Sequence, residues 1–350
     1  MTAGLVAAPS AVDDVARGRV RRAVRWRAVV TVLAVLVVLT YVLTLMVGRT
    51  FYPPGDVVRV VLGQDVPGAS FTVGRLRLPR ATLAVVAGLS FGLAGVTFQT
   101  MLRNPLASPD VIGISTGASA AAAVAIVLLG LGGTAVSVFA IVAGLVVAVL
   151  IYLLAYKDGG AGTRFILIGI GMAAMLHSVI AYVLSRASQW DYQEALRWLS
   201  GSLNGVTWDR TVPALVVLVV LGPVLLTQTR ALEAIQLGDD TASALGVRVE
   251  RTRLLAMVAA VGVLAFATAA CGPIAFVAFL AGPIAARVVG PNGSLLLPAA
   301  LVGALLVLVA DLCGQFAFGT RFPVGVVTGV LGAPYLIYLI VRSNRVGGSL

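Results

Sequence analysis

Two arginines three positions apart are the residues whose chemistry says most about this chain. Arg77 and Arg80 stand in the sequence Arg-Leu-Pro-Arg, directly before a long apolar segment rich in glycine and alanine. That segment ends in a turn containing Asn104, Pro105 and Pro109. A guanidinium group is permanently charged and binds carboxylates through a planar fork of donors. Cations at one end of an apolar helix and a broken turn at the other suggest a gated membrane pathway with a docking site.

Two ionisable residues, His177 and Asp311, interrupt the apolar segments. A central aspartate costs roughly 2.5 to 3.5 kcal/mol on insertion scales, and each Leu, Ile or Val returns about 0.3 to 0.6 kcal/mol. The aliphatic residues around Asp311 offset this cost, so we expect its carboxylate to face protein or a cavity rather than lipid. A lone histidine in an apolar helix is more often packed and hydrogen-bonded than a ligand, and we expect this of His177. Two such groups provide poorly for a proton relay.

The sequence contains no pattern typical of a catalytic or metal site. It has no His and Glu at metal-binding spacing and no convincing pair of nucleophile and base. Its single lysine, Lys157, does not belong to a phosphate-binding loop of the form Gly-x-x-x-x-Gly-Lys-Ser/Thr. We therefore predict a chain that is not an enzyme and has no metal or cofactor of its own. If ATP drives its function, a partner ATPase uses the ATP and Mg²⁺.

Composition predicts that these residues act in a membrane. The 350 residues are 59% hydrophobic and 11% charged, with a mean hydropathy of +1.03, whereas soluble domains contain about 25% charged residues. A membrane-spanning helix needs about 20 mainly apolar residues. We therefore predict an all-α membrane protein, a bundle of about ten transmembrane helices, with approximate spans at 28–47, 81–102, 111–130, 134–155, 165–185, 211–229, 254–271, 274–288, 295–317 and 324–341. The third and eighth segments are the shortest or most interrupted.

The basic residues predict the orientation of the bundle. The first apolar run is too long for a secretory signal peptide and no cleavage site follows it, so we expect a retained anchor. With the N-terminus in the cytoplasm, sixteen Lys and Arg residues fall on the cytoplasmic side and nine on the outer side. This asymmetry favours an N-in, C-in topology. The net charge of +11 then reflects topology and contact with anionic membrane lipid, and no nucleic acid is expected as a partner.

Four polar stretches, at 1–26, 48–76, 186–210 and 230–253, are predicted to be loops. The second is expected to hold a short helix at 56–63. The third is expected to be either an amphipathic helix at the outer membrane interface or a plain aromatic belt that anchors the outer surface. Nine outer arginines are many for a translocated face, which indicates an acidic partner there.

The stretch 230–253 predicts two short helices on the cytoplasmic face. The first ends at Gly238, Asp239 or Asp240 caps the second, and Gly246 ends it. This stretch is either a solvated loop between two spans or a coupling surface for a cytoplasmic partner. A small apolar ridge flanked by charges is costly to leave exposed, which favours the coupling surface.

Several stretches resemble the permease subunits of bacterial iron-siderophore, haem and cobalamin ATP-binding-cassette (ABC) importers, the FecCD type. They are RLPRATLAVVAGLSFGLAGVTFQTMLRNPLASPDVIGISTGAS, IQLGDDTASALGVRVERTR, ACGPIAFVAFLAGPIAARVVG, LPAALVGALLVLVADLCGQF and RFPVGVVTGVLGAPYLIYLI. The resemblance implies a basic cytoplasmic arm at 1–27, a ten-helix permease domain of the type II importer kind at 28–345 and a tail at 346–350. It also implies a second permease subunit, a cytoplasmic ATPase that contacts 230–253, and an extracytoplasmic substrate-binding protein.

The resemblance also suggests roles for individual residues. In the family, arginines matching Arg77, Arg80 and Arg321 are implicated in docking acidic residues of the binding protein, so charge reversal at Arg80 or Arg321 is expected to weaken docking. An alternative is that Arg77 and Arg80 extend to lipid headgroups. The residues implied to couple to the ATPase are Gly238, Asp239, Asp240, Ala242, Leu245 and Gly246.

The resemblance predicts import of an iron-siderophore complex across the bacterial plasma membrane. ATP-driven alternating access would open a path lined by the second, fifth and tenth spans of two permeases. Many members have Pro-His where this chain has Pro283-Ile284, which favours a ferric siderophore over cobalamin. Cobalamin or haem remains an alternative substrate. An ion-driven secondary transporter is the main alternative function, but it commonly has an internal repeat, and the sequence contains no clear one.

Overall fold

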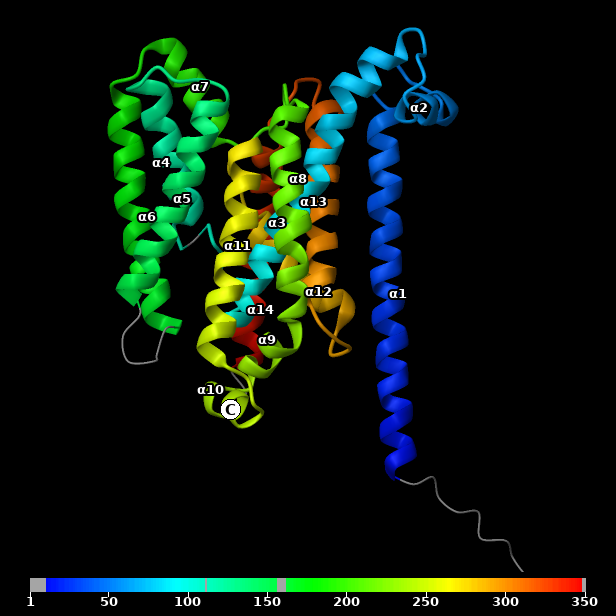
Figure 1. Ribbon diagram of the computed structural model, residues 1–350, viewed down its shortest axis with the longest axis vertical. Coiled ribbons are helices and arrows are strands. Elements are labelled where there is room, and N and C mark those ends of the chain that lie inside the picture. Colours follow the sequence, from blue (N-terminus) through cyan, green and yellow to red (C-terminus); the bar gives the residue numbers. More distant parts are fainter. Residues whose placement is uncertain (1–10, 111, 156–161, 348–350) are drawn as a thin grey trace, which may run out of the picture.

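The computed structural model describes residues 11–110, 112–155 and 162–347, and this part of the chain contains helices and no strands. Seven of its helices are long and apolar enough to span a membrane, and three shorter apolar ones accompany them. The prediction of an all-α bundle of ten spans is confirmed (Figure 1). The ten are α1 (Ala11–Met46), α3 (Leu78–Met101), α4 (Ile114–Val127), α5 (Thr134–Ala155), α6 (Gly162–Ser185), α8 (Trp208–Thr227), α11 (Val249–Cys271), α12 (Val277–Val289), α13 (Leu296–Phe316) and α14 (Val324–Gly347).

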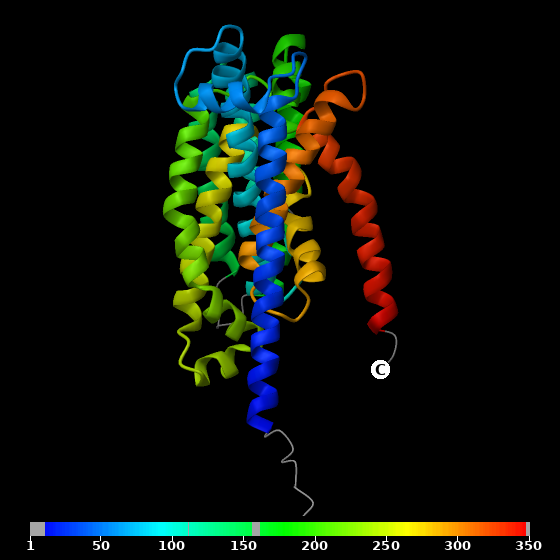
Figure 2. The same cartoon turned by 90° about the vertical axis from the view of Figure 1, so that its right-hand side faces the viewer.

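Short helices lie at the two ends of this bundle. α2 (Pro54–Val61), the π-helix η1 (Ser70–Arg77) and α7 (Gln189–Leu199) lie at one end, and α9 (Thr229–Gln236) and α10 (Asp239–Ala244) at the other (Figure 1). Following the predicted orientation, we call these the outer and inner ends, and we call α9 and α10 together the knob. α1 begins and α14 ends at the inner end (Figure 2). The helices predicted in 48–76, 186–210 and 230–253 are therefore present.

The predicted loop at 1–26 is wrong for the described residues, because α1 is already helical at Ala11. Its 36 residues make a helix about 54 Å long, which exceeds the roughly 30 Å hydrocarbon thickness of a bilayer. Arginine is a good helix former, so the basic stretch continues the spanning helix toward the inner end. Lys157, residues 1–10 and residues 348–350 of the predicted tail lie outside the described residues.

α3 is the central helix of the bundle and packs against α8, α11, α12 and α13. Small residues permit this close approach. A Cβ at Gly88 or Gly92 would overlap the backbone of α13, and one at Gly95 would overlap the backbone of α12. Because α3 is buried on nearly all sides, the prediction that the second span lines a path is wrong for this protomer.

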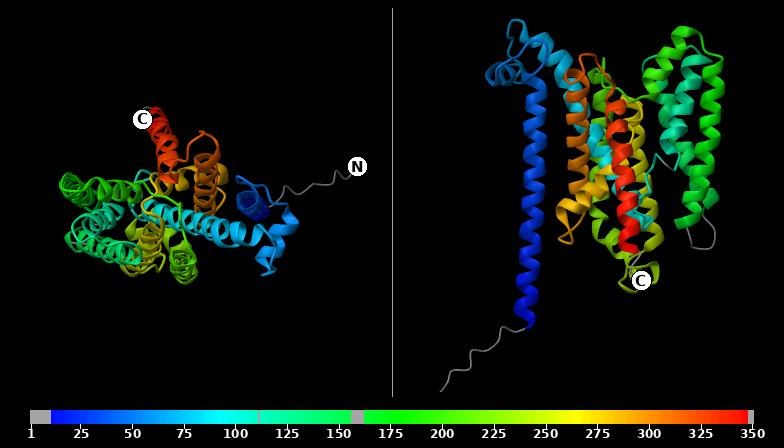
Figure 3. Two further views of the ribbon diagram at one scale, coloured as in Figure 1. Left: turned by 90° about the horizontal axis from the view of Figure 1, so that it is seen from above. Right: turned by 180° about the vertical axis from the view of Figure 1, so that it is seen from behind.

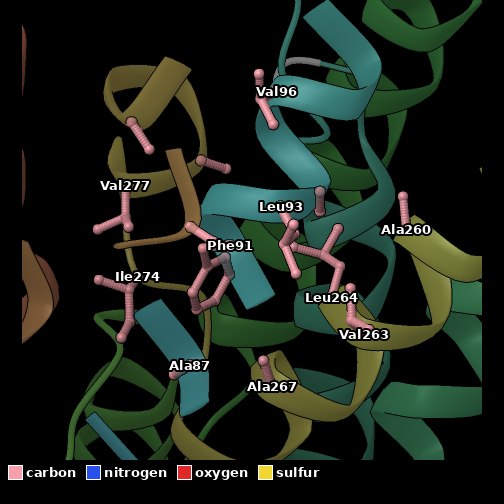
Figure 4. Packing of buried hydrophobic residues seen from close by; sticks show 14 of the residues in the cluster. Ala87, Phe91, Leu93, Val96, Ala260, Val263, Leu264, Ala267, Ile274 and Val277 are labelled. Atoms are coloured by element: carbon pink, nitrogen blue, oxygen red, sulfur yellow. The ribbon is translucent and has the colours of Figure 1, made fainter. Parts of the chain in front are cut away.

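The packing around α3 is apolar on both flanks. Phe91 points toward Ile274 and Val277 of the segment that leads into α12, while Leu93 points toward Leu264 of α11 (Figure 4). All five side chains are buried. α3 is therefore closely packed on two sides as it runs from the outer to the inner end.

An internal repeat is present, contrary to the sequence-based expectation. Helices α3 to α6 have 24, 14, 22 and 24 residues, and α11 to α14 have 23, 13, 21 and 24. α3 starts at the outer end, whereas α11 starts at the inner end beside the knob (Figure 1). In both sets a residue with positive φ precedes the short second helix, Gly113 at 93° and Phe276 at 64°. The repeat lies in helix length and direction, which the sequence pattern did not reveal.

The helices that follow α1 form two groups. α4 to α7 gather on one side, beside the group built by α3, α8 and α11 to α14 (Figure 3). α5 packs against α11 and α4 also contacts it, which joins the two groups.

Candidate functional site

The three predicted docking residues, Arg77, Arg80 and Arg321, line one cavity at the outer end. This cavity has a volume of about 330 Å³ and is bordered by the end of α1, by η1 and by the end of α13, and Arg49 lines it as well. No acidic residue is among the described residues that line it. We call it the outer arginine cavity. Four guanidinium groups around one concave site favour an anionic group there.

Arg77 is bound within the chain. Its Nη1 donates to the carbonyls of Leu45 and Met46, both at 2.9 Å, and its Nη2 donates to the carbonyl of Thr50 at 2.7 Å. The last carbonyls of a helix have no partner within that helix, so Arg77 caps the outer end of α1. Its guanidinium also lies 5.1 Å from the ring centroid of Tyr52.

Arg80 is bound within the chain as well. Its Nε donates to Asp311 Oδ2 at 2.9 Å, and its Nη2 donates to Asp311 Oδ1 at 2.7 Å. Its Nη1 donates to Asn204 Oδ1 at 2.7 Å, and Gln315 Nε2 donates to Asp311 Oδ2 at 2.8 Å. The side chains of Arg80 and Asp311 are 15% and 2% exposed. A desolvated bidentate pair of this kind is a strong, geometrically specific contact.

These contacts change which arginines are available for docking. Arg77 and Arg80 bind carbonyls and a carboxylate of the chain itself, which also disfavours the alternative that they extend to lipid headgroups. Arg49 and Arg321 are exposed, and neither has an ion pair or hydrogen bond among the described residues. Docking stays a prediction, and the geometry makes Arg49 and Arg321 the guanidinium groups available for it.

The two intramembrane candidates have different environments. Asp311 faces protein as predicted, but it lies five residues before the end of α13 and near the outer end rather than at mid-span. His177 is exposed on α6, so the expectation that it is packed within the bundle is wrong for this protomer. Sequence periodicity could not decide its direction because α6 is apolar on several faces.

The knob is folded as two helices joined at Gly238. The φ of Gly238 is 108°, a conformation that favours glycine, and Gly246 at 82° follows the second helix. The prediction that Asp239 or Asp240 caps α10 is wrong, because Gly238 occupies the N-cap position and no side chain caps it. Ala242 is buried and Leu245 is exposed at 65%. The knob thus presents an apolar side chain that no described residue covers.

Asp239 contacts two arginines from other segments. Its Oδ1 accepts from Arg253 Nη2 at 2.8 Å and lies 3.5 Å from Arg103 Nη2. Asp240, its neighbour, is exposed and makes no ion pair among the described residues. The two adjacent carboxylates, which the sequence did not distinguish, therefore have different surroundings.

Sequence reasoning missed several polar residues. Arg49 was counted among the outer arginines without a role, and Asn204 was not singled out. Asp110, between α3 and α4, accepts from Ser115 Oγ at 2.6 Å, and its buried Oδ2 has no hydrogen-bond partner among the described residues. Its position directly after Pro109 in a turn would have been the available signal. The described residues contain no group of three or more His, Cys, Asp or Glu that could hold a metal ion.

Known proteins are similar to this chain in sequence and in fold. Residues 35–342 match the FecCD transport family. The chain is 41% identical to the ferric enterobactin transport system permease protein of Escherichia coli, over 85% of this chain and 91% of that protein. It is 35% identical to the Fe(3+)-citrate import system permease protein of Bacillus subtilis, over 90% and 95% of the two chains. A chain of a metal-chelate type ABC transporter, solved in an inward-facing conformation, superposes with a TM-score of 0.80 at 25% identity and covers 90% of this chain and 99% of its own.

Proposed function

Since the chain belongs to the FecCD transport family, we propose that it is the membrane-spanning permease subunit of an ABC importer for ferric chelates of the siderophore class. It is a multi-pass protein of the plasma membrane. The observation that carries this proposal is the pairing of an arginine-lined cavity at the outer end with a two-helix knob at the inner end. The outer end suits contact with an acidic substrate-binding protein, and the inner end suits contact with a cytoplasmic ATPase.

The outer arginine cavity receives an acidic side chain of a substrate-binding protein. Charge complementarity of this kind steers encounter and fixes register. Arg49 and Arg321 make the contact, while Arg77 and Arg80 hold the cavity wall in shape.

The knob receives the ATPase. Leu237 and Leu245 are 66% and 65% exposed at its surface, and an apolar pair surrounded by charges is typical of a protein contact. ATP and Mg²⁺ are used by that partner, and this chain performs no covalent chemistry.

A second permease, either a copy of this chain or a relative, completes the translocation path. α6 and α14 keep exposed faces, with Leu167, Met175, Val330 and Ile337 each more than half exposed in the isolated protomer. The path is lined by these helices, because α3 is enclosed by its own protomer. Motion of the knob changes access to the path by biasing two packings of the bundle.

The proposed substrate class is taken from the substrates for which similar proteins are named. The two iron-transport relatives are named for ferric enterobactin and Fe(3+)-citrate, which supports a ferric chelate over cobalamin or haem. An ion-driven transporter is the other candidate, since inverted repeats also occur in that class. Family membership disfavours it.

The test is iron uptake into proteoliposomes that contain this chain assembled with a partner ATPase and supplied with a substrate-binding protein. ⁵⁵Fe is offered as ferric enterobactin and as ferric citrate, and cyanocobalamin is the comparison substrate. We expect uptake of a ferric chelate that requires ATP and the binding protein. Uptake driven by a proton or sodium gradient without ATP would refute the proposal, and uptake of cyanocobalamin alone would refute its substrate assignment.

A further inference from the structure

Asp239 is the point at which the knob is tied to the membrane helices. Arg253, its closer partner, lies on the second turn of α11, and Arg103 directly follows the inner end of α3. One carboxylate oxygen, Oδ1, contacts both guanidinium groups. The contacts therefore join three segments that are separate in sequence.

The backbone at Arg103 directs this side chain toward the knob. Its φ is 51°, in the left-handed region that non-glycine residues seldom adopt. The amide of Asn104 donates to the carbonyl of Gln99 at 3.0 Å, which closes the end of α3 in this conformation. Arg103 Nη1 then lies beside Gly238, at the joint between α9 and α10.

α3 extends this connection to the opposite end of the molecule. Its first turn carries Arg80, which lines the outer arginine cavity, and its last turn leads into Arg103. Gly88 and Gly92 pack closely against α13, and Gly95 packs closely against α12. A displacement at one end of α3 is therefore transmitted rather than absorbed.

The Asp239 contacts are poorly suited to a purely stabilising role. The side chain of Asp239 is 33% exposed, and those of its partners Arg103 and Arg253 are 46% and 16% exposed. Ion pairs that water reaches contribute little to stability. An apolar contact would hold the knob in place more firmly. A charged link that can break and re-form suits a joint that moves.

We propose that Asp239 is a positioning residue that transmits motion of the knob to the inner ends of α3 and α11. When the ATPase displaces the knob, Asp239 moves Arg103 and Arg253 with it, and α3 and α11 shift together. This inference rests on the proposed function, in which the knob is the ATPase contact.

Asp239→Asn and Asp240→Asn form a matched pair of variants for the test. They remove the same charge from adjacent positions of α10, and only Asp239 has ion-pair partners among the described residues. The assay uses the complete transporter in proteoliposomes with ⁵⁵Fe-labelled ferric enterobactin or ferric citrate, whichever the wild type imports. The quantity measured is the coupling ratio, defined as iron imported per ATP hydrolysed. Copurification of the ATPase is measured in parallel.

We expect Asp239→Asn to lower the coupling ratio about fivefold or more with ATPase copurification unchanged. Asp240→Asn is expected to stay within about a factor of two of the wild type, and Asp239→Glu to recover at least half of the loss. Equal coupling ratios in Asp239→Asn and Asp240→Asn would overturn the proposal. Loss of ATPase binding in Asp239→Asn alone would also overturn it, because Asp239 would then be a contact residue of the ATPase.

Arg253→Gln and Arg251→Gln test the same link if Asp239→Asn fails to assemble. Both arginines lie in the first turns of α11, and Arg251 is exposed and makes no ion pair among the described residues. We expect a lower coupling ratio for Arg253→Gln only, and equal ratios would overturn the proposal. Failure of the proposed function is distinguishable, because the wild type would then show no ATP-dependent import.

Discussion

Arg80 at the start of α3 binds both carboxylate oxygens of Asp311 near the end of α13. The pair fixes these two helices at the outer end, beyond the close contacts that Gly88 and Gly92 make with α13. It also satisfies a carboxylate that would be costly to insert alone. The sequence predicted a docking role for Arg80 and an intramembrane position for Asp311. In the structure the two residues form one ion pair with each other.

Removing one member of this pair should destabilise the protomer more than removing both. Asp311→Leu or Arg80→Met leaves a buried charge without its partner, which costs roughly 3 kcal/mol. The double variant Arg80→Met/Asp311→Leu replaces the pair by apolar side chains and should lie closer to the wild type than either single variant. The thermal unfolding midpoint in detergent, followed by tryptophan fluorescence, is the measurement.

The exposed pair of Asp14 and Arg17 on α1 is the control, because its side chains are 65% and 57% exposed. Asp14→Asn should change the midpoint little. Additive effects of the two single substitutions at Arg80 and Asp311 would show that the pair is energetically unimportant.

Arg49→Glu and Arg321→Glu should weaken binding of the substrate-binding protein without unfolding this chain. Both arginines are exposed in the outer arginine cavity, so reversal breaks no hydrogen bond or ion pair among the described residues. We expect a roughly tenfold loss of affinity per substitution, about 1.4 kcal/mol, measured by biolayer interferometry on nanodisc-embedded transporter. Arg80→Glu is unsuitable for this question, because it would place a carboxylate against Asp311 and unfold the cavity.

Arg59→Glu is the matched control for docking, since Arg59 is exposed at the outer end but does not line the cavity. Each of the three charge reversals weakens the long-range electrostatic attraction and should therefore lower the association rate. This difference in association rate should vanish at high salt. Only the cavity variants should raise the dissociation rate. Identical dissociation rates in the three variants would exclude the cavity as the docking contact.

Arg77→Lys should loosen the outer end of α1. An ammonium group cannot reproduce the planar fork that binds the carbonyls of Leu45, Met46 and Thr50. We expect a local cost of about 1 kcal/mol, seen as faster hydrogen exchange in residues 45–52 with unchanged exchange in α11. Arg75→Lys, at an exposed neighbouring position without a hydrogen bond or ion pair among the described residues, should leave exchange unchanged. Equal effects of both substitutions would contradict the capping role.

The helix count and the two short helices of the knob could be predicted from the sequence, because each depends on local composition or spacing. Apolar runs of about 20 residues predict spans without knowledge of their neighbours. Gly238 and Gly246 interrupt the helical pattern wherever the knob lies. The family resemblance predicted one docking role for Arg77, Arg80 and Arg321, although Arg321 is far from the other two in sequence.

What the sequence missed depends on which residues meet in space. Nothing in the neighbourhood of Arg80 indicates that Asp311, on another helix, already binds it. The direction of His177 depends on which side of α6 the bundle occupies. The inverted repeat depends on the relative direction of α3 and α11. Each is a tertiary relationship, and the hydropathy pattern of a uniformly apolar chain carries little information about such relationships.

Two glycines one turn apart on α14 should respond to the same substitution with opposite signs. A Cβ at Gly325 would overlap the carbonyl oxygen of Ser200, whose chain neighbour Gly201 also accepts the amide of Gly325 at 3.1 Å. At Gly329 a Cβ meets nothing within 4 Å. Gly325→Ala should therefore cost about 1 to 3 kcal/mol through overpacking, and Gly329→Ala should gain about 0.5 to 1 kcal/mol through helix propensity. The thermal unfolding midpoint of each purified variant measures its change in stability. An equal loss of stability in the two variants would mean that the contact with Ser200, at the end of α7, does not position the start of α14.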